Sequence, residues 1–229
     1  MEGIGIGSII CWRHWFPLYL IVLSLGSTHA QQSQVGTRIH VLVLYENGGH
    51  HLEYTNAAVP WLKQLATDSS LVLDFITSTD KINEAFLANY QLIVQLDYPP
   101  YGWKEEAAAA FANYIEEGKG GWIGFHHATL LGEFDGYSMW GWFSGFMGGI
   151  GYQNYIADFA SADVIVEANS HPVMKGLPAK FPVKKEEWYT YDKSPRPNVR
   201  VLASVDESTS FLTPRLRWAT TLWYGRMRM

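Results

Sequence analysis

Residues 38–51 read RIHVLVLYENGGHH, and this stretch is the basis for the predicted fold. Its first part, Arg38 to Tyr45, is a short apolar run of the length typical of a buried strand. A glycine turn with two histidines follows, and a helical pattern then runs from Leu52 to Ala66. A buried strand that passes through a glycine turn into a helix is typical of a sheet whose strands are joined by helices.

The same alternation continues along the chain. Further strands are predicted at residues 71–76, 91–96 and 121–125, and further helices at 81–89 and 104–117. Strands that alternate with helices are joined by right-handed crossovers, so we predict an α/β fold with a doubly wound, mostly parallel sheet. Ligands of such sheets bind beyond the carboxyl ends of the strands. We therefore expect the loops after Tyr45, Leu96 and Phe125 to share one crevice.

The composition is that of a globular protein with one core. The chain has 229 residues, of which 48% are hydrophobic and 17% are charged, and its net charge is -5. This balance argues against a nucleic-acid partner, because binding to phosphates needs clustered Lys and Arg. Ten Trp and thirteen Tyr are more than packing usually demands, and exposed rings suit sugar faces or flat ligands. The oligomeric state stays open, with a homo-oligomer among the possibilities.

The first 30 residues have the pattern of a signal peptide. An apolar run from Trp15 to Gly26 follows Arg13, and cleavage is predicted near Ala30. A retained membrane anchor is the alternative, but the run is shorter than the roughly 20 residues of a spanning helix. We therefore expect a secreted or periplasmic protein whose domain occupies residues 31–210. The only cysteine, Cys11, lies in the signal, so the mature chain would have neither a disulfide nor a thiolate nucleophile.

Residues 124–128 read GFHHA and have the spacing of a nucleophile elbow. In such an elbow a strained turn at the end of a strand projects its middle side chain, and small neighbours avoid clashes. Here His126 takes the place of the usual Ser or Cys. An imidazole in this place can serve as a base, an acid or a metal ligand. The alternative is a structural histidine at a strand end.

Other polar residues are expected at the same edge of the sheet. We predict that four of them contact the substrate: His50, Glu53, Asp97 and His127. Imidazoles together with carboxylates would also hold a divalent metal, for which His51 and His126 are the candidate ligands, although their spacing matches no zinc signature. The alternative is hydrogen bonding to sugar hydroxyls, with Trp61, Trp103 or Trp140 stacking beneath, although each Trp taken singly fits a core position better.

Five stretches make the chain resemble the ThuA-like (trehalose utilisation) family. Between Arg38 and Asp206 they are, in the family's order, VLVLYENGGHHLEYT, LANYQLIVQLDY, FANYIEEGKGGWIGFHHA, SHPVMKGLP and EEWYTYD. The resemblance implies the fold of class I glutamine amidotransferases, which has a flavodoxin-like sheet. It also implies a role in the catabolism of sugars, often keto-disaccharides, so a sugar or keto-sugar is the expected partner.

The resemblance also implies roles for single residues. His51, His126 and Glu187 are the expected catalytic residues, while Trp188 and Tyr189 join the residues expected to contact the substrate. Amidotransferases place Cys at the elbow, whereas ThuA-like proteins have His there, so glutamine hydrolysis is excluded. A hydrolase, lyase or isomerase acting on carbohydrates is the implied activity, and a non-catalytic sugar-binding module is the alternative. His171, in SHPVMKGLP, is expected only to order its loop.

Residues 211–229 depart from the rest of the chain. They contain four Arg and no acidic residue, whereas residues 31–210 contain 12 basic and 21 acidic residues. One interpretation is a basic, amphipathic tail. The other is a shifted reading frame, because codons for these residues can be chosen so that the neighbouring frame contains Gly-Asp-His-Pro-Val-Val-Trp, which resembles the family's continuation. Our hypothesis is an aberrant, frameshifted tail on a C-terminally truncated domain, in which case the product would fold poorly or lack activity.

The frameshift hypothesis makes a prediction about the gene. A single insertion or deletion near the codon of Ser210 should restore a longer reading frame with the family's pattern. Sequencing the gene and its transcript checks this directly. An intact frame through residues 211–229, with no such continuation in either neighbouring frame, would contradict the hypothesis.

Overall fold

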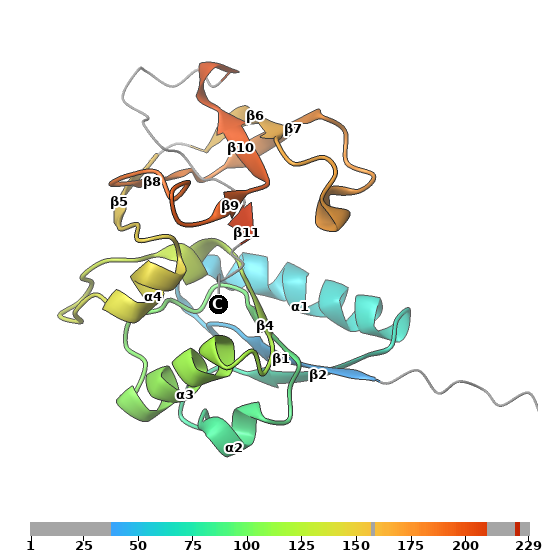
Figure 1. The fold of residues 1–229 in the computed structure, drawn as a ribbon. Coiled ribbons are helices and arrows are strands. Elements are labelled where there is room, and N and C mark those ends of the chain that lie inside the picture. The colour runs from blue at the N-terminus through green and yellow to red at the C-terminus, as the bar shows by residue number, and fades with distance from the viewer. Residues whose placement is uncertain (1–37, 157–158, 210–222, 225–229) are drawn as a thin grey trace, which may run out of the picture. The chain divides into compact units, whose positions relative to one another are not determined.

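A computed structural model describes residues 38–156, 159–209 and 223–224 of the chain (Figure 1). The predicted signal peptide at residues 1–30 lies outside these ranges, as does the predicted tail at 211–229 apart from Trp223 and Tyr224. In the part of the chain that the structure describes, no helix has the length and apolar character needed to cross a membrane.

Four parallel strands form the central sheet in the order β2-β1-β3-β4. These strands are β1 (Ile39–Leu44), β2 (Leu71–Ile76), β3 (Leu92–Gln95) and β4 (Gly121–Gly124). The apolar run of β1 explains its place between β2 and β3, since Leu42, Val43 and Leu44 are fully buried. The strand order matches the first four strands of a flavodoxin-like sheet, so the predicted α/β fold with a parallel, flavodoxin-like sheet is confirmed.

Helices cover both faces of this sheet. They are α1 (Leu52–Thr67), α2 (Glu84–Leu87), α3 (Glu105–Glu116) and α4 (Gly141–Phe146). Figure 1 shows α1 on one side of the sheet and both α2 and α3 on the other. Neighbouring residues of β1 point to opposite faces: Val41 and Val43 share a cluster with Leu62 of α1, whereas Leu42 shares one with Phe111 of α3. This alternation gives each helix layer its own apolar contact.

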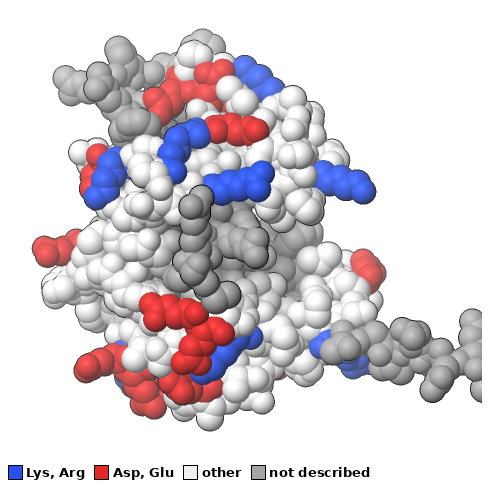
Figure 2. Space-filling model, viewed as in Figure 1, with Lys and Arg blue, Asp and Glu red and all other residues white. Residues whose placement is uncertain are grey.

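Local sequence sets where two of the helices begin. Asn83 precedes α2, and its side chain accepts a hydrogen bond from the Phe86 backbone N–H at 2.9 Å, so the helix is shorter than the predicted span of 81–89. Glu105 and Glu106 occupy the first turn of α3, where acidic groups stabilise the positive end of the helix dipole. Acidic side chains gather over α2 and α3 on the face shown in Figure 2, while basic side chains lie mainly over the antiparallel strands.

The second half of the described chain is built from short antiparallel strands, for which the sequence analysis predicted no elements. Strand β5 (Tyr152–Tyr155) pairs with β8 (Tyr189–Tyr191). A sheet of order β10-β6-β7 contains β6 (Ala160–Val166), β7 (Lys180–Glu186) and β10 (Ala203–Asp206). Strand β9 (Arg200–Val201) pairs with β11 (Trp223–Tyr224), which lies inside the predicted tail. Alternate residues of β6, Ala162, Val164 and Val166, point into an apolar cluster with Leu202.

Short 3-10 turns sit at several loop ends. They are η1 (Gly49–His51), η2 (His126–Thr129), η3 (Pro172–Met174) and η4 (Glu207–Thr209). His171 precedes η3, and its Nδ1 accepts a hydrogen bond from the Val173 N–H at 3.3 Å, which fits the loop-ordering role expected for it. After β4 the chain forms only η2, and no regular helix begins before α4. The elbow therefore joins a strand to a 3-10 turn.

Gly124 leaves no room for a side chain at the end of β4. A Cβ at this position would overlap the indole of Trp122 and lie 3.0 Å from the Cβ of Ala128. The indole has little freedom to move, because its Nε1 donates to Gln95 Oε1 at 3.0 Å and its ring packs edge-on against Phe143. The glycine of GFHHA is therefore required by close packing before the elbow, as the motif predicts.

We expect Gly124→Ala to lower the free energy of unfolding by about 1–3 kcal/mol, the usual cost of forcing an extra carbon into a packed site. Gly121→Ala in the same strand is the matched control, because its new Cβ would meet only Leu92 Cδ1 at 3.5 Å. Urea denaturation followed by tryptophan fluorescence measures both changes. Equal stability of the two variants would contradict the packing explanation.

Candidate functional site

The backbone of His126 adopts a left-handed conformation at the tip of the elbow. Its φ is 44°, a value that a residue with a β-carbon rarely adopts. The parallel ladder holds the chain up to Phe125, whose N–H donates to the Gln95 carbonyl at 2.9 Å. Beyond the turn, Thr129 Oγ1 donates to the His126 carbonyl at 2.7 Å, and the Tyr191 hydroxyl donates to Thr129 Oγ1 at 2.7 Å. The elbow is thus held from both sides with an imidazole at its tip.

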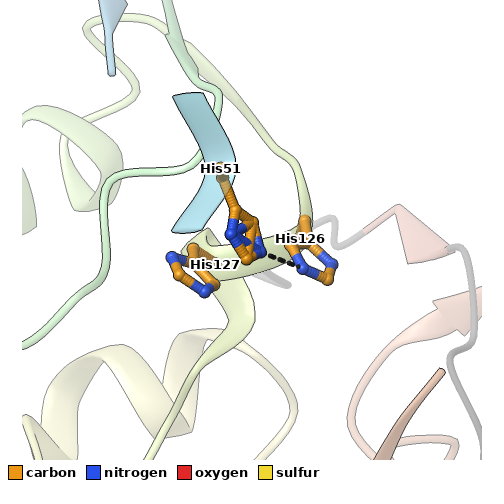
Figure 3. A group of neighbouring side chains, drawn as sticks. All are labelled: His51, His126 and His127. Carbon is orange, nitrogen blue, oxygen red and sulfur yellow. Dashed lines mark hydrogen bonds between the residues drawn. The ribbon is translucent and has the colours of Figure 1, made fainter. Parts of the chain in front are cut away.

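The imidazoles of His126 and His51 meet at this edge of the sheet. Their Nε2 atoms lie 2.8 Å apart, and their rings stack with centroids 4.6 Å apart (Figure 3). His51 ends η1 in the loop after β1, so residues 75 positions apart are brought into contact. The loops after β1 and β4 therefore meet, as the parallel topology predicts.

A third imidazole, that of His127, completes the cluster. Its ring centroid lies 3.9 Å from that of His51 and 5.3 Å from that of His126. One nitrogen from each of the three rings lies within 4.8 Å of the others. We call these residues, His51, His126 and His127, the histidine cluster (Figure 3).

The antiparallel strands bring a carboxylate and a phenol to the same point. Glu187, between β7 and β8, places its Oε2 3.0 Å from Nε2 of His126 and 3.9 Å from Nε2 of His51. The hydroxyl of Tyr189 lies 3.0 Å from the same nitrogen of His126. The structure therefore brings together all three residues expected to be catalytic, His51, His126 and Glu187, and adds Tyr189 to them.

Burial controls the protonation of the imidazoles. Desolvation, followed by the neighbouring charges of His127 and His51, lowers the pKa of His126 to about 3. The pKa of His127 falls to about 4, mainly by desolvation, with His51 adding to the shift and a hydrogen bond to the backbone of Asp97 opposing it. Both rings are therefore neutral at pH 7 and each has one nitrogen lone pair available.

The acidic groups of the site shift in the opposite direction. Desolvation raises the pKa of the Glu187 carboxyl, while the charge of His51 lowers it in part. Desolvation, followed by the charge of Glu187, also raises the pKa of the Tyr189 hydroxyl. Glu46, whose Oε2 lies 3.7 Å from Nδ1 of His127, likewise has a raised pKa because of burial and of the nearby Asp97. The site thus holds carboxylates that take up a proton more readily than in water.

Asp97 supports the site from beneath. It is fully buried, and its Oδ1 accepts the Glu46 backbone N–H at 2.7 Å while its Oδ2 accepts the Thr55 hydroxyl at 2.5 Å. These bonds tie the loop after β1, and the start of α1, to the end of β3. We expected Asp97 to contact the substrate. The structure instead places its side chain where no part of it reaches the surface.

Other predicted substrate contacts lie outside the cluster. His50 and Glu53 are exposed on η1 and α1. Trp188 is 4% exposed, packs in the apolar cluster of the antiparallel strands and donates from Nε1 to the Ala160 carbonyl at 3.0 Å. Trp188 therefore belongs to the core, because the alternation of the EEWYTYD stretch turns it away from the side chains of Glu187 and Tyr189.

Of the three tryptophans considered for stacking beneath a sugar, two pack in the core and one is exposed. Trp103 and Trp140 contact each other with ring centroids 5.4 Å apart and pack against Phe111 in the core. Trp61 lies on α1 and is 61% exposed. Trp103 and Trp140 therefore serve the core, as each was expected to do taken singly.

Sequence reasoning missed several residues that shape the site. Glu46, Thr55, Thr129 and Tyr191 hold the two loops or contact the histidine cluster. Signals for two of them were present in the sequence. Glu46 follows the first strand almost directly, and Tyr191 lies two residues after Tyr189 in EEWYTYD, where strand alternation places both side chains on one face.

Comparison with known proteins identifies the family. Residues 40–228 match the family model named ThuA, which is described as trehalose utilisation. The chain belongs to the ThuA family. The match extends into residues 211–228, the segment interpreted as a frameshifted tail, whose origin stays a prediction. No curated protein matches the chain.

Two solved structures of ThuA-like proteins resemble the chain. One is from Bacteroides uniformis ATCC 8492 and shares 30% identity with a TM-score of 0.67, covering 76% of this chain and 71% of that one. The other is from Parabacteroides merdae ATCC 43184 and shares 21% identity with a TM-score of 0.52, covering 75% of this chain and 70% of that one. The second supports the fold alone, while the first also agrees with membership of the ThuA family.

The buried position of Asp97 makes a prediction about stability. Asp97→Ala should lower the free energy of unfolding by about 1–3 kcal/mol, because it leaves the N–H of Glu46 without its acceptor. Asp97→Asn is the matched variant, since its side-chain oxygen can still accept that N–H, and it should lose less. Urea denaturation measures both. Unchanged stability of the alanine variant would contradict the supporting role and favour a contact with substrate.

Proposed function

We propose that this ThuA-family protein is a carbohydrate-utilisation enzyme, a hydrolase, lyase or isomerase that acts on a sugar or keto-sugar. The observation that carries the proposal is the convergence on one atom, Nε2 of His126, of three polar groups at hydrogen-bonding distance. These are Nε2 of His51 at 2.8 Å, Oε2 of Glu187 at 3.0 Å and the Tyr189 hydroxyl at 3.0 Å. Groups of these types, held by a strained turn, are typical of sites that move protons.

A keto-sugar suits this set of groups. A carbon next to a carbonyl loses its proton readily when the carbonyl oxygen is polarised and a base lies close to the C–H bond. The carboxylate of Glu187 is the base in our proposal, because burial raises its pKa towards neutrality. His126 acts on the sugar oxygen, either by hydrogen bonding as an acid–base group or as a metal ligand, and His51 assists it.

The fate of the proton then defines the reaction. Isomerisation follows if the hydroxyl proton on the deprotonated carbon moves to the former carbonyl oxygen and Glu187 returns its proton to the former carbonyl carbon. Alternatively, the electrons of the broken C–H bond expel the glycosidic oxygen, which takes up the proton that Glu187 removed, and a sugar is released by elimination. Addition of water to that product would complete a net hydrolysis.

Glutamine amidotransferase activity has no support in this site. Such an activity needs a thiolate at the elbow, where this chain has the imidazole of His126. The only cysteine of the chain is Cys11. The proposal also includes export, which rests on the apolar run from Trp15 to Gly26 and not on the fold.

A non-catalytic sugar-binding role is the second candidate. It is favoured by the lowered pKa values of His126 and His127, about 3 and about 4, because rings that stay neutral at pH 7 are poor proton donors to a leaving group. Neutral imidazoles and the Tyr189 hydroxyl would still hydrogen-bond to sugar hydroxyls.

Incubation with a substrate panel tests the proposal. The purified chain is incubated with disaccharides and their 3-keto forms, and products are read by mass spectrometry and, for isomers, by chromatography. We expect at least one keto-sugar to be converted. Binding of a sugar with no conversion of any panel member would favour the binding module, and neither binding nor conversion would contradict both candidates.

Substitution of the elbow histidine tests the site itself. His126→Gln should lower kcat by roughly 10²–10⁴-fold, the usual contribution of a positioned acid–base group. His40→Gln is the matched control, because His40 is exposed near the start of β1, at the edge of the sheet opposite the histidine cluster. A His126→Gln variant that is folded by circular dichroism and keeps full activity would exclude this site.

A further inference from the structure

In the part of the chain that the structure describes, the carboxylates of the site have no Lys or Arg as an ion-pair partner. Glu187 and Glu46 each direct a carboxylate at the histidine cluster, and Glu187 lies nearest, with 3.0 Å between its Oε2 and Nε2 of His126. Three imidazoles in ring contact cannot all be protonated, because their like charges repel each other. A positive centre among these groups would balance the carboxylates.

The distances match the coordination shell of one ion. Two ligands that each lie 2.0–2.1 Å from a tetrahedral zinc ion are roughly 3.3 Å apart. The corresponding separations here bracket this value: 2.8 Å between the Nε2 atoms of His51 and His126, 3.0 Å from His126 to Glu187 Oε2, and 3.9 Å from His51 to the same oxygen. Small side-chain rotations would equalise them.

Hydrogen bonding alone does not account for this convergence. A neutral imidazole nitrogen has either one proton or one lone pair. Nε2 of His126 nevertheless has His51, Glu187 and Tyr189 around it at 2.8–3.0 Å. One proton on this nitrogen could form a good hydrogen bond to only one of these neighbours. An ion between His126, His51 and Glu187 would instead accept a lone pair from each of them.

A buried nitrogen of His127 adds a second, independent observation. Nδ1 of His127 is buried without a hydrogen-bond partner; so is Nδ1 of His51, but the ion proposed below would bind the other nitrogen of that ring, Nε2. An unpartnered buried polar atom is costly and indicates an ion or water at the site. Nδ1 of His127 lies 3.7 Å from Oε2 of Glu46, so this nitrogen faces a carboxylate of the same site.

From this arrangement we infer that the site binds a divalent transition-metal ion through the imidazoles of His51 and His126 and the carboxylate of Glu187, with one nitrogen of His127 within 4.8 Å of a nitrogen of each of the other two rings. Imidazole nitrogens favour zinc and its first-row neighbours over magnesium or calcium, which prefer oxygen ligands. Two histidines and one carboxylate leave an open position on the ion for a substrate oxygen. The inference rests on the proposed function and deepens it, because the ion would polarise the sugar carbonyl while Oε1 of Glu187, the oxygen not bound to the ion, would remain as the base.

Metal binding to the full chain tests this inference without any activity assay. The protein is stripped with a chelator and dialysed, and Zn²⁺ is then titrated in by calorimetry, with Co²⁺ as a second probe because its visible absorption reports the ligands. We expect one ion per chain, with a rise in melting temperature on binding. His51→Gln and His126→Gln should each weaken Zn²⁺ binding by at least roughly 100-fold, since even the residues that orient ligands change affinity by 10–100-fold.

Two controls separate this site from other histidines. His50→Gln removes an exposed neighbour of His51, and His40→Gln removes an exposed histidine at the far end of β1, so both should bind Zn²⁺ like the parent. The inference is overturned if the folded parent chain binds less than one ion per ten chains. It is equally overturned if His51→Gln and His126→Gln, both folded by circular dichroism, bind as tightly as the parent. Glu187→Gln, a smaller change, provides a third variant and should alter the Co²⁺ spectrum.

The experiments can distinguish failure of the metal-site inference from failure of the proposed function. A metal-free chain that converts a keto-sugar as fast as the metal-loaded chain would refute a metal role while supporting the enzyme. A chain that binds one ion at the predicted residues and converts no sugar would support the metal site while refuting the enzyme.

Discussion

The left-handed backbone of His126 is the constraint on which the site depends. A φ of 44° at a residue with a β-carbon costs on the order of 1–3 kcal/mol, and it persists only where surrounding contacts hold it. Here the parallel ladder holds the chain before the turn, and the bonds from Tyr191 to Thr129 and from Thr129 to His126 hold it after the turn. Without this turn the chain would continue as an extended strand, and the imidazole would point to one face of the sheet.

Two different parts of the fold supply the chemistry. The parallel sheet provides the imidazoles, because the loops after β1 and β4 leave the same edge and Asp97 ties the first of them to β3. The antiparallel strands provide the carboxylate of Glu187 and the phenol of Tyr189. The described residues of both parts belong to one compact unit.

Burial changes what these groups can do. In water an imidazole and a carboxyl differ by about two units of pKa, and at pH 7 the carboxyl is ionised. Desolvation lowers the pKa values of His126 and His127 and raises those of Glu187 and Tyr189. The result is a set of neutral nitrogen donors beside a carboxylate of increased basicity. That combination suits both the movement of a proton and the binding of a cation.

The sequence by itself determined the parallel half of the fold and the elbow, because both depend on short-range patterns: apolar runs, glycine turns and the small residue at 124. With the family resemblance it also determined that His51, His126 and Glu187 belong together. Only the tertiary structure decided that Asp97 and Trp188 are buried supports, that the ring of His127 packs with those of His51 and His126, and that Glu46 adjoins this cluster. It alone also showed the antiparallel strands, β5 to β11. The physical reason is that side-chain direction and strand pairing depend on contacts between residues far apart in the chain, which no local pattern encodes.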